Sequence, residues 1–234
     1  MEIMITLYQF PAAYGLSSMS PFCTKVEVYF KLADIDYQLE YALVPFAPKR
    51  KLPYIDDDGI IVADSSDIIS HCRSNYGDSL DDGLSKSDHA IGHALQRTLE
   101  EHFYWSLVYS RWIDPAGWAV YRKQVWKLLP FGLRWPLLLL SRRRMKTYLH
   151  GQGLGRHKAA DIYDRGVADI DSIANFLGDR HFLFGDRPCS YDAVLYAFMR
   201  HVSLFPVESP LTRSLYSHEK LLAYTVRMKD CVGI

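Results

Sequence analysis

Residues 51–68 read KLPYIDDDGIIVADSSDI, and this stretch decides the fold. Two short apolar runs, 52–55 and 60–63, flank a cluster of aspartates, and Asp58-Gly59 supplies the positive φ angles that a tight hairpin turn requires. The second run leads directly into Asp64-Ser65, either of which can cap a helix, and then into an apolar pattern of helical period. The stretch therefore predicts a β-hairpin that ends where a helix begins.

The junction between the hairpin and the helix is typical of an anion site. A helix N-terminus presents unpaired N–H groups and a partial positive charge, which suit a carboxylate or a phosphate. Pro53 costs no ladder hydrogen bond at the start of a strand, and it forces Leu52 to be extended with its backbone polar groups facing out of the strand pair. Such an edge can hold a small peptide, although an ordinary edge hairpin followed by a capped helix fits these residues equally well.

The chain before this stretch alternates strand and helix. Residues 3–10 are rich in β-forming residues and predict a first strand. Ser20-Pro21 places a hydroxyl residue at an N-cap and proline at the first helical position, and the apolar face that follows predicts a helix. A second strand is predicted at 37–43 and a loop at 45–50. The order β-α-β-β-β-α, with a parallel first pair and a right-handed crossover, is that of a thioredoxin-like domain.

The remainder of the chain is predicted to be helical. Residues 77–86 are small, polar and acidic, which indicates a linker. From residue 87 on, apolar residues keep helical spacing, and Asp114-Pro115 ends the first long helix. The sequence thus predicts an all-α domain, with helices at 87–113, 117–129, 133–150, 158–178, 190–204 and 217–229.

Composition bounds the function. The 234 residues include 27 basic and 27 acidic ones, so no global field favours binding to nucleic acid. The four cysteines form no C-x-x-C pair and have no zinc-ligand spacing, and no signal segment follows Met1, which together favour a reducing compartment. We therefore expect a cytoplasmic protein that binds no nucleic acid.

Three features resemble a membrane anchor, a metal site and a reactive thiol, and for each of them a purely structural role is favoured. Residues 135–140 precede three arginines and resemble a membrane anchor, but the run is far short of the roughly 20 residues that a span needs, so a buried helix with a solvated basic end is expected. His89 and His93 could bind a metal from one helix face, but no third ligand falls in step. Cys23 lies on the buried side of its predicted helix, which favours a structural thiol over a reactive one.

Six motifs in a fixed order resemble the glutathione transferase superfamily, and within it the branch that includes failed-axon-connections and metaxin-like proteins. The resemblance covers nearly the whole chain. It implies a thioredoxin-like, glutathione-binding domain at 1–76, a linker at 77–86 and an all-helical domain at 87–234. The motifs are SPFC at 20–23, PKRKLPYI at 48–55, DSSDI at 64–68, RWIDP at 111–115, GLGRH at 153–157 and FGDRPCSYD at 184–192.

The resemblance implies a glutathione site built on the hairpin. Pro53 would be the cis-proline of this fold, and Leu52 would pair its backbone with the cysteinyl part of glutathione. Asp64 and Ser65 would hold the γ-glutamyl end of the tripeptide. The expected glutathione-binding set is completed by Lys51 and Ser20.

Two positions depart from the family pattern. Arg50 stands where the family usually has glycine, and it adds a charged side chain beside the glycyl end of the tripeptide. Cys189 stands three residues before Asp192, where a threonine or serine normally opens a capping box. Either Ser190 caps this helix instead, or the helix start is weaker by about 1 kcal/mol.

The chemistry of such a site is the formation of a thiolate at neutral pH. A thiol with a pKa of about 8.5 is only a few per cent ionised at pH 7. One hydrogen bond donated to the charged form, worth roughly 1.5 to 3 kcal/mol, lowers this pKa by about one to two units. Ser20 stands at a helix N-terminus, where related transferases carry serine or cysteine, and is the expected donor. Tyr8 and Tyr14 are the alternatives.

The resemblance implies an enzyme, a glutathione transferase that conjugates the glutathione thiolate to small apolar electrophiles. Glutathione would be its co-substrate, with no metal and no membrane span, and a two-fold homodimer and a role in detoxification are expected with it. A non-catalytic binding or scaffold module, as among metaxin-like relatives, is the alternative, whereas a thiol transferase would need a cysteine where Ser20 stands. The pocket for the electrophile is expected to be lined by Tyr14, Tyr104, Trp105 and Tyr109.

Overall fold

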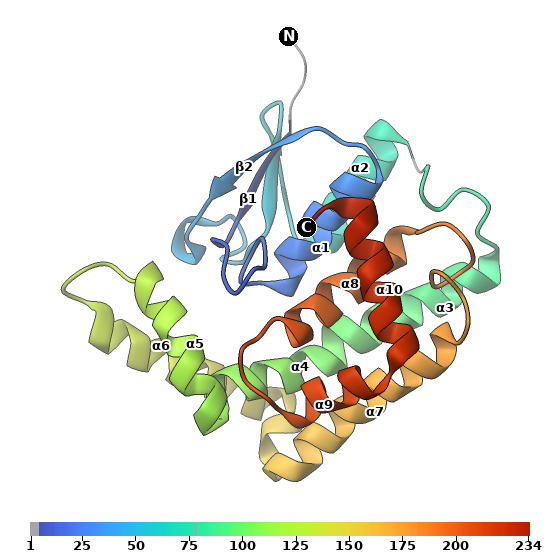
Figure 1. Cartoon of the computed structure of the whole chain (residues 1–234). Coiled ribbons are helices and arrows are strands. Elements are labelled where there is room, and N and C mark those ends of the chain that lie inside the picture. The colour runs from blue at the N-terminus through green and yellow to red at the C-terminus, as the bar shows by residue number, and fades with distance from the viewer. Residues whose placement is uncertain (1–4, 78) are drawn as a thin grey trace.

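The computed structural model describes residues 5–77 and 79–234, and it combines a small mixed sheet, flanked by helices, with a helical body (Figure 1). The strand order is β2-β1-β3-β4, in which β1 and β2 are parallel and β3 is antiparallel to both of its neighbours. This order confirms the predicted thioredoxin-like domain. The strands are β1 (Ile5–Gln9), β2 (Tyr37–Tyr41), β3 (Tyr54–Asp57) and β4 (Ile60–Ala63).

The predicted hairpin is confirmed at its turn. Asp58 and Gly59 have φ angles of 51° and 87°, both positive, as a two-residue type I′ turn requires. The N–H of Gly59 donates to the carboxylate of Asp56 over 2.7 Å, and Asp57 pairs with Ile60 across the turn. The hairpin is thereby fixed in the register that brings the end of β4 to the start of the next helix.

The two helices of the first domain begin at the predicted caps. Helix α1 (Pro21–Leu32) follows Ser20 as N-cap, and helix α2 (Ser65–Tyr76) follows Asp64. The 3-10 helix η1 (Val44–Phe46) occupies part of the predicted loop at 45–50. Residues 3 and 4 of the predicted first strand lie outside the described residues.

The second part of the chain is helical, as predicted. Residue 78 of the predicted linker lies outside the described residues, so the exact division of the chain into domains stays a prediction. The long helix predicted at 87–113 is continuous but contains two π-helical segments, η2 and η3. The elements are α3 (Lys86–Arg97), η2 (Thr98–Phe103), α4 (Tyr104–Val108), η3 (Tyr109–Ile113), α5 (Pro115–Leu128), α6 (Arg134–Gln152), η4 (Leu154–Arg156), α7 (Ala159–Leu177), α8 (Ser190–Ser203), α9 (Pro210–Ser217) and α10 (Glu219–Val232).

Helix α9 is absent from the sequence prediction, although its start carries a clear signal. Ser209 accepts a hydrogen bond from the backbone N–H of Thr212, and the hydroxyl of Thr212 accepts one from the backbone N–H of Ser209. Pro210 then occupies the first helical position. This is a capping box followed by a short amphipathic helix.

One hydrophobic core is shared by the sheet and the helical body. It contains Ile5 and Leu7 of β1 and Val26 and Phe30 of α1, together with residues of α8 and α10, all almost completely buried. Helix α1 packs along α8, so the first domain is held by the second over the whole length of α1. The N-terminus of α1 is consequently a rigidly supported position.

The prediction that residues 135–140 form a buried helix is wrong. Helices α5 and α6 form a hairpin that projects from the helical body (Figure 1), so only one face of α6 contacts protein. Trp135, Leu139 and Leu140 are 64%, 62% and 60% exposed, whereas Leu138 is buried. None of the described helices is long and apolar enough to cross a membrane.

The start of α8 resolves the alternatives at its cap. Cys189 is the N-cap, and its backbone N–H and its thiol both donate to the carboxylate of Asp192, over 2.9 and 3.1 Å. Ser190 is already the first helical residue, and its hydroxyl donates to Asp81 instead. The alternative in which Ser190 caps the helix is therefore wrong.

Candidate active site

The loop before β3 leaves a backbone edge open. The peptide bond between Leu52 and Pro53 is cis, as the resemblance implies. The side chain of Leu52 is buried in a small apolar cluster with Cys23 and Ala47, which fixes the loop. Within the part of the chain that the structure describes, neither the N–H nor the C=O of Leu52 has a backbone hydrogen-bond partner. An extended peptide can pair with both groups.

The N-terminus of α2 lies next to this edge. Asp64 has a φ of 100° and caps the helix, because its carboxylate accepts a hydrogen bond from the N–H of Ser66 over 3.1 Å. The structure thus selects Asp64 over Ser65 as the cap. Ser65 is buried at the first helical position, and Asp64 is exposed. The site therefore combines a carboxylate, which suits an ammonium group, with helix N–H groups, which suit a carboxylate.

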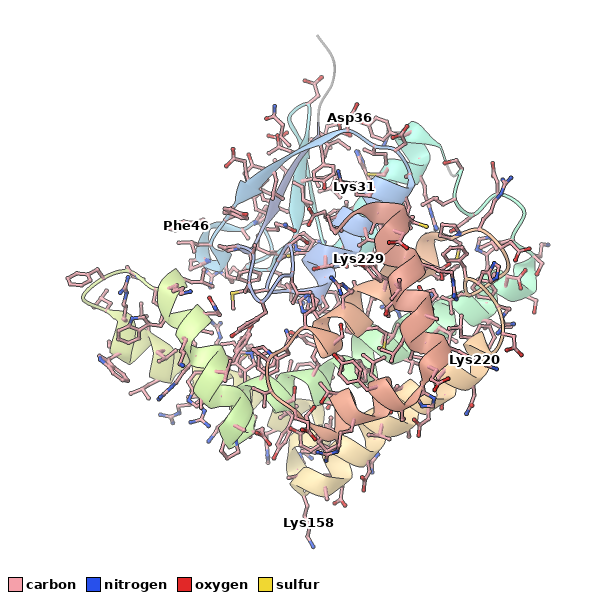
Figure 2. The ribbon with its side chains drawn as sticks, in the orientation of Figure 1. Lys31, Asp36, Phe46, Lys158, Lys220 and Lys229 are labelled. Atoms are coloured by element: carbon pink, nitrogen blue, oxygen red, sulfur yellow. The ribbon has the colours of Figure 1, made fainter. Side chains whose placement is uncertain are left out.

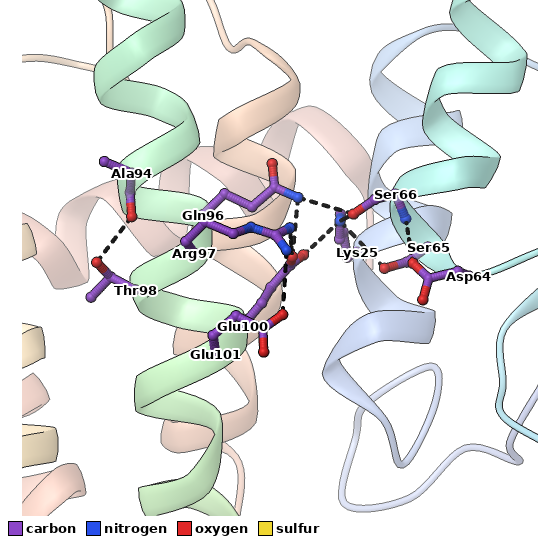
Figure 3. Close-up of polar contacts among 10 residues, drawn as sticks. All are labelled: Lys25, Asp64, Ser65, Ser66, Ala94, Gln96, Arg97, Thr98, Glu100 and Glu101. Carbon is purple, nitrogen blue, oxygen red and sulfur yellow. Dashed lines mark hydrogen bonds and ion pairs between the residues drawn. The ribbon is translucent and has the colours of Figure 1, made fainter. Parts of the chain in front are cut away.

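A buried network of charged side chains from α1 and the long helix contacts the start of α2 (Figure 3). Lys25 of α1 donates from its Nζ to Glu100 over 2.6 Å, to the hydroxyl of Ser66 over 3.2 Å and to that of Ser65 over 3.3 Å. The side chains of Lys25 and Glu100 are only 1% and 4% exposed. Burial lowers the pKa of Lys25, while Glu100 acts in the opposite direction. Lys25 and Glu100 therefore hold the two serines in fixed orientations.

Two residues of α3 complete the network. Gln96 donates to the hydroxyl of Ser66 over 3.2 Å and to Glu100 over 3.1 Å, and Arg97 donates to the same carboxylate. The sequence analysis did not identify these partners, because they come from α1 and α3 and the pair Lys25–Glu100 spans 75 positions. The local signal was weak, because Lys25 follows Thr24 and precedes Glu27 in a helix of mixed composition.

The N-terminus of α1 carries Ser20, the residue expected to activate the thiol. The carbonyl of Ser20 accepts hydrogen bonds from the N–H groups of Cys23 and Thr24, both over 3.1 Å, but its hydroxyl makes no capping bond. That hydroxyl lies beside the sulfur of Cys23, which is in the same apolar cluster as Leu52. Ser20 therefore lies beside the cluster that holds the side chain of Leu52.

Cys23 itself has a structural role. Its side chain is completely buried, and burial raises its pKa to about 11. A thiol with this pKa is protonated at neutral pH and is a poor nucleophile. The interpretation of Cys23 as a structural thiol agrees with this environment.

The two alternative hydroxyl residues are engaged elsewhere. Tyr8 stacks on Tyr54 with ring centroids 4.4 Å apart and planes at 6°, next to the cluster that contains Leu52. Tyr14 donates from its hydroxyl to the carbonyl of Val120 over 3.4 Å, and burial raises its pKa to about 12. Tyr8 is thus beside the expected tripeptide, whereas Tyr14 faces α5.

The four residues of the expected electrophile pocket pack in different clusters, although the rings of Tyr104 and Trp105 are in contact, with centroids 5.3 Å apart. Trp105 and Tyr109 pack in a cluster around Leu149, Leu154 and Ile162, away from Tyr14. Tyr104 packs edge-on against Phe22 of α1, with ring centroids 5.0 Å apart, and burial raises its pKa to about 12. Tyr14 and Tyr104 therefore both lie near Arg111 and Tyr121, whereas Trp105 and Tyr109 also pack around Leu149.

Arg111 is the charged residue of the shared environment, and the sequence analysis assigned it no role. It is buried, it lies near both Tyr14 and Tyr104, and it donates to the carbonyl of His201 over 2.8 Å. Among the described residues no carboxylate pairs with it. The burial of His201, and then the positive charge of Arg111, lower the pKa of His201 well below the usual value, so that ring is neutral at pH 7. The region around Tyr14 and Tyr104 consequently favours negative charge.

The remaining expected residues lie at the rim. Lys51 and Arg50 are both exposed, and Arg50 has a φ of 52°, in the left-handed region that favours glycine. The family's preference for glycine at this position therefore has a conformational reason. In the described ranges, no group of three His, Cys, Asp or Glu side chains is placed to hold a metal ion.

A thioredoxin-like domain with a cis-proline, an open backbone edge and a capped helix beside it defines a class of proteins that bind a small peptide. Comparison with known families agrees. A family model described as the glutathione S-transferase N-terminal domain matches residues 21–117, and one described as the glutathione S-transferase C-terminal domain matches residues 166–228.

Three relatives span nearly the whole chain. Isoprene-epoxide–glutathione S-transferase of Rhodococcus sp. (strain AD45) is 34% identical over 97% of this chain and 98% of its own length. Failed axon connections of Drosophila melanogaster is 29% identical over 97% of this chain and 57% of its own length. The mitochondrial outer membrane import complex protein metaxin of Arabidopsis thaliana is 28% identical over 96% and 71%.

A solved structure shows the same fold. Glutathione transferase GSTFuA3 from Phanerochaete chrysosporium superposes with a TM-score of 0.67 at 20% identity, covering 97% of each chain. The chain therefore belongs to the glutathione S-transferase family; it is an enzyme, and glutathione is its co-substrate. The resemblance to the branch with failed-axon-connections and metaxin-like proteins is confirmed by the relatives.

Proposed function

We propose that this transferase activates glutathione through Ser20 and conjugates it to a small epoxide. The observation that carries the proposal is the open backbone of Leu52, together with the N-terminus of α1, where the hydroxyl of Ser20 makes no capping bond, and the capped N-terminus of α2. The epoxide class is taken from the name of the Rhodococcus relative, which matches this chain over its full length.

The tripeptide is expected to lie across both helix starts. Its cysteinyl part pairs with the backbone of Leu52, and its γ-glutamyl ammonium group binds the exposed carboxylate of Asp64. The γ-glutamyl carboxylate binds Ser65 and the N–H groups of α2, supported by the positive charge of Lys25. The glycyl end lies towards Lys51.

The thiolate is expected to form at the N-terminus of α1. The hydroxyl of Ser20 donates a hydrogen bond to the sulfur, and the partial positive charge of the helix adds to it. Each contribution favours the ionised form, so the pKa of bound glutathione falls by about one to two units below 8.5. Tyr8 and Tyr14 are the alternative donors, and the existing bond from Tyr14 to Val120 makes it the weaker candidate.

Ring opening needs an acid as well as a nucleophile. The sulfur attacks an epoxide carbon, the carbon–oxygen bond breaks, and the oxygen leaves as an alkoxide that takes up a proton. Tyr14 and Tyr104 are both kept protonated by burial and both lie near Arg111, so either can donate to that oxygen. We therefore propose a pocket narrowed to these two tyrosines, without Trp105 and Tyr109.

The test is the absorbance of the thiolate against pH for protein saturated with glutathione. The wild type should show a thiol pKa well below 8.5, and Ser20→Ala should raise it by about one to two units with little change in affinity. Tyr8→Phe and Tyr14→Phe serve as matched variants. A shift confined to one of these tyrosine variants would transfer the role to that residue.

The binding half of the proposal has a separate test. Ser65→Ala should weaken glutathione binding by more than about 1.5 kcal/mol in calorimetry, because a hydrogen bond to a charged group is lost. Ser74→Ala is the control in the same helix, where the hydroxyl bonds only to the carbonyl of Ser70. Equal affinities of the two variants would contradict the assignment of the α2 N-terminus.

A non-catalytic binding or scaffold role is the second candidate, favoured by the similarity to metaxin of Arabidopsis thaliana. It predicts tight glutathione binding with an unperturbed thiol pKa in the wild type.

We further propose a homodimer, since Phe46 is 82% exposed at the outer edge of the first domain (Figure 2) and Ile60 and Ile61 are exposed on the edge strand β4. A monomer mass in light scattering would contradict it. A cytoplasmic location and a role in detoxification complete the proposal.

A further inference from the structure

The hairpin of α5 and α6 carries an uneven share of the charge. Residues 115–152 contain eight of the 27 basic residues and none of the 27 acidic ones, so the hairpin bears +8 while the rest of the chain bears −8. The balanced total hides this separation. Exposed basic side chains on the hairpin are Arg122, Lys123, Lys127, Arg143, Arg144 and Lys146, and no carboxylate of the described residues pairs with them.

The end of the hairpin that projects from the body is apolar. Phe131, in the turn between the two helices, is 91% exposed, and Leu133 beside it is 57% exposed. Trp135, Leu139 and Leu140 of α6 continue this surface. These five side chains, which we call the apolar tip, would each gain free energy by leaving water, and although Trp135 packs edge-on against Trp126, all five are more than half exposed within the described structure.

The apolar tip and the basic residues follow one another along the same face of α6. Residues four positions apart lie on one face, so Trp135 is followed by Leu139 and then by Arg143, and Leu140 is followed by Arg144. At about 1.5 Å per residue, the arginines lie about 6 Å behind the leucines and the tip from Trp135 to Leu140 spans about 7 to 8 Å. Helices that lie in the membrane interface bury their apolar face about 5 to 10 Å deep, and an apolar tip of this length reaches a similar depth when the hairpin enters end-on, which leaves the arginines near the headgroups.

We propose that the α5–α6 hairpin docks this protein on an anionic lipid bilayer, with the apolar tip inserted among the acyl chains and the basic residues at the headgroups. Charge complementarity selects this partner, because a surface of +8 with exposed leucines fits a layer of negative headgroups over hydrocarbon. A nucleic acid would leave Leu139 and Leu140 without a partner. A second copy of this chain is disfavoured, because a two-fold contact between the tips would bring two +8 hairpins together and they would repel each other.

The opposite face of the hairpin is part of the site already described. Trp118, Tyr121 and Val125 of α5 are buried against the loop that carries Tyr14, and the hydroxyl of Tyr14 donates to the carbonyl of Val120 in the same helix. Docking through the apolar tip would therefore place the neighbourhood of Tyr14 at the bilayer surface. Apolar compounds concentrate there, so the hairpin would bring the enzyme to its class of substrate. The docking itself does not depend on glutathione chemistry.

The experiment is flotation of the full chain with vesicles of phosphatidylcholine alone and of phosphatidylcholine mixed with phosphatidylserine. The wild type should float with the mixed vesicles and lose most of this binding in high salt. Arg143→Gln/Arg144→Gln should weaken the partition at least tenfold, since each basic residue contributes a factor of about five. Trp135→Ser/Leu139→Ser/Leu140→Ser should reduce it as much.

Matched controls are available on the rest of the surface. Arg165→Gln/Lys229→Gln removes two exposed cations outside the hairpin, Lys229 being labelled on α10 in Figure 2, and Val226→Ser removes an exposed apolar side chain. Both should float like the wild type, and every variant should retain glutathione affinity if it is folded. Equal loss in the control variants, or no flotation of the wild type, would overturn the proposal. Two other results, each in the absence of vesicle binding, would also overturn the proposal. One is a wild-type dimer that the tip variant converts to a monomer, and the other is binding of the wild type to RNA.

Discussion

Replacing Glu100 with glutamine tests the buried ion pair that connects α1 to the helical body. Lys25 and Glu100 are almost completely buried and their charged atoms are 2.6 Å apart. Glutamine keeps the shape but leaves the ammonium group of Lys25 buried without an opposite charge. Breaking a buried pair on one side costs about 3 to 5 kcal/mol, which is a large part of a total stability of about 5 to 15 kcal/mol. We expect the unfolding free energy of Glu100→Gln to fall by at least about 3 kcal/mol.

The adjacent residue supplies the control. Glu101 also pairs with Arg97, at 3.3 Å, but its side chain is 67% exposed, and exposed pairs contribute only about 0 to 1 kcal/mol. Urea unfolding followed by circular dichroism should therefore show a large fall in midpoint for Glu100→Gln and almost none for Glu101→Gln, at similar slopes.

The loss should also depend on pH in a defined direction. Burial lowers the pKa of Lys25 in the folded protein, and without Glu100, which raises it, the folded pKa falls further. Between this folded value and the unfolded value of about 10.4, the unfolded chain binds more protons, so unfolding free energy rises with pH. The deficit of Glu100→Gln should therefore shrink, by up to about 1.4 kcal/mol per pH unit, as the pH rises from the folded pKa of Lys25 in the variant to its higher folded pKa in the wild type. Equal losses in both variants, or a deficit that is the same at every pH, would refute the reasoning.

Two further predictions concern packing and thiol reactivity. A Cβ atom at Gly117 would lie 1.7 Å from the backbone oxygen of Ser110, so Gly117→Ala should lower the free energy of unfolding by about 3 kcal/mol. Gly151 has open space around it, so Gly151→Ala should raise the free energy of unfolding by about 0.5 to 1 kcal/mol. Thermal unfolding compares the two variants, and similar shifts would argue against the close contact at Gly117. Cys231 is exposed and the other three cysteines are buried, so iodoacetamide should add one group to each folded chain and none to folded Cys231→Ser. Mass spectrometry counts the added groups, and a second adduct on the folded wild type would contradict the burial of the other thiols.

The elements that could be predicted from the sequence are those with local signals. The turn at Asp58-Gly59 and the helix start at Ser20-Pro21 are encoded within a few residues, because turn and cap geometry depend on neighbouring backbone angles. The capping box at Ser209 is equally local, and α9 was within reach of the same reasoning. Of the site, the cis-proline loop and the cap at Asp64 follow from this kind of signal together with the family resemblance.

What could not be predicted depends on contacts between distant segments. The pair of Lys25 with Glu100 forms only when α1 is laid against the long helix, and nothing near either residue specifies it. The exposure of Leu139 and Leu140 has the same origin, since an apolar run is buried only if another element covers it, and none covers the tip of the hairpin. The placement of Tyr14 and Tyr104 near Arg111, and of Trp105 and Tyr109 around Leu149, likewise depends on contacts between segments that are distant in the sequence.

The shared core has a consequence for biosynthesis. Tyr224 and Met228 of α10 belong to the same core as Val26 and Phe30 of α1, so the first domain receives part of its covering from a helix translated roughly 150 residues after α2. Helix α10 ends roughly 200 residues after α1, so at about 5 to 20 residues per second the apolar face of α1 waits about 10 to 40 s on the ribosome before that partner is complete. During this interval the nascent chain exposes surface that a chaperone would bind. Ribosome-bound chains that stop before α10 should accordingly be digested by protease more readily than the released protein.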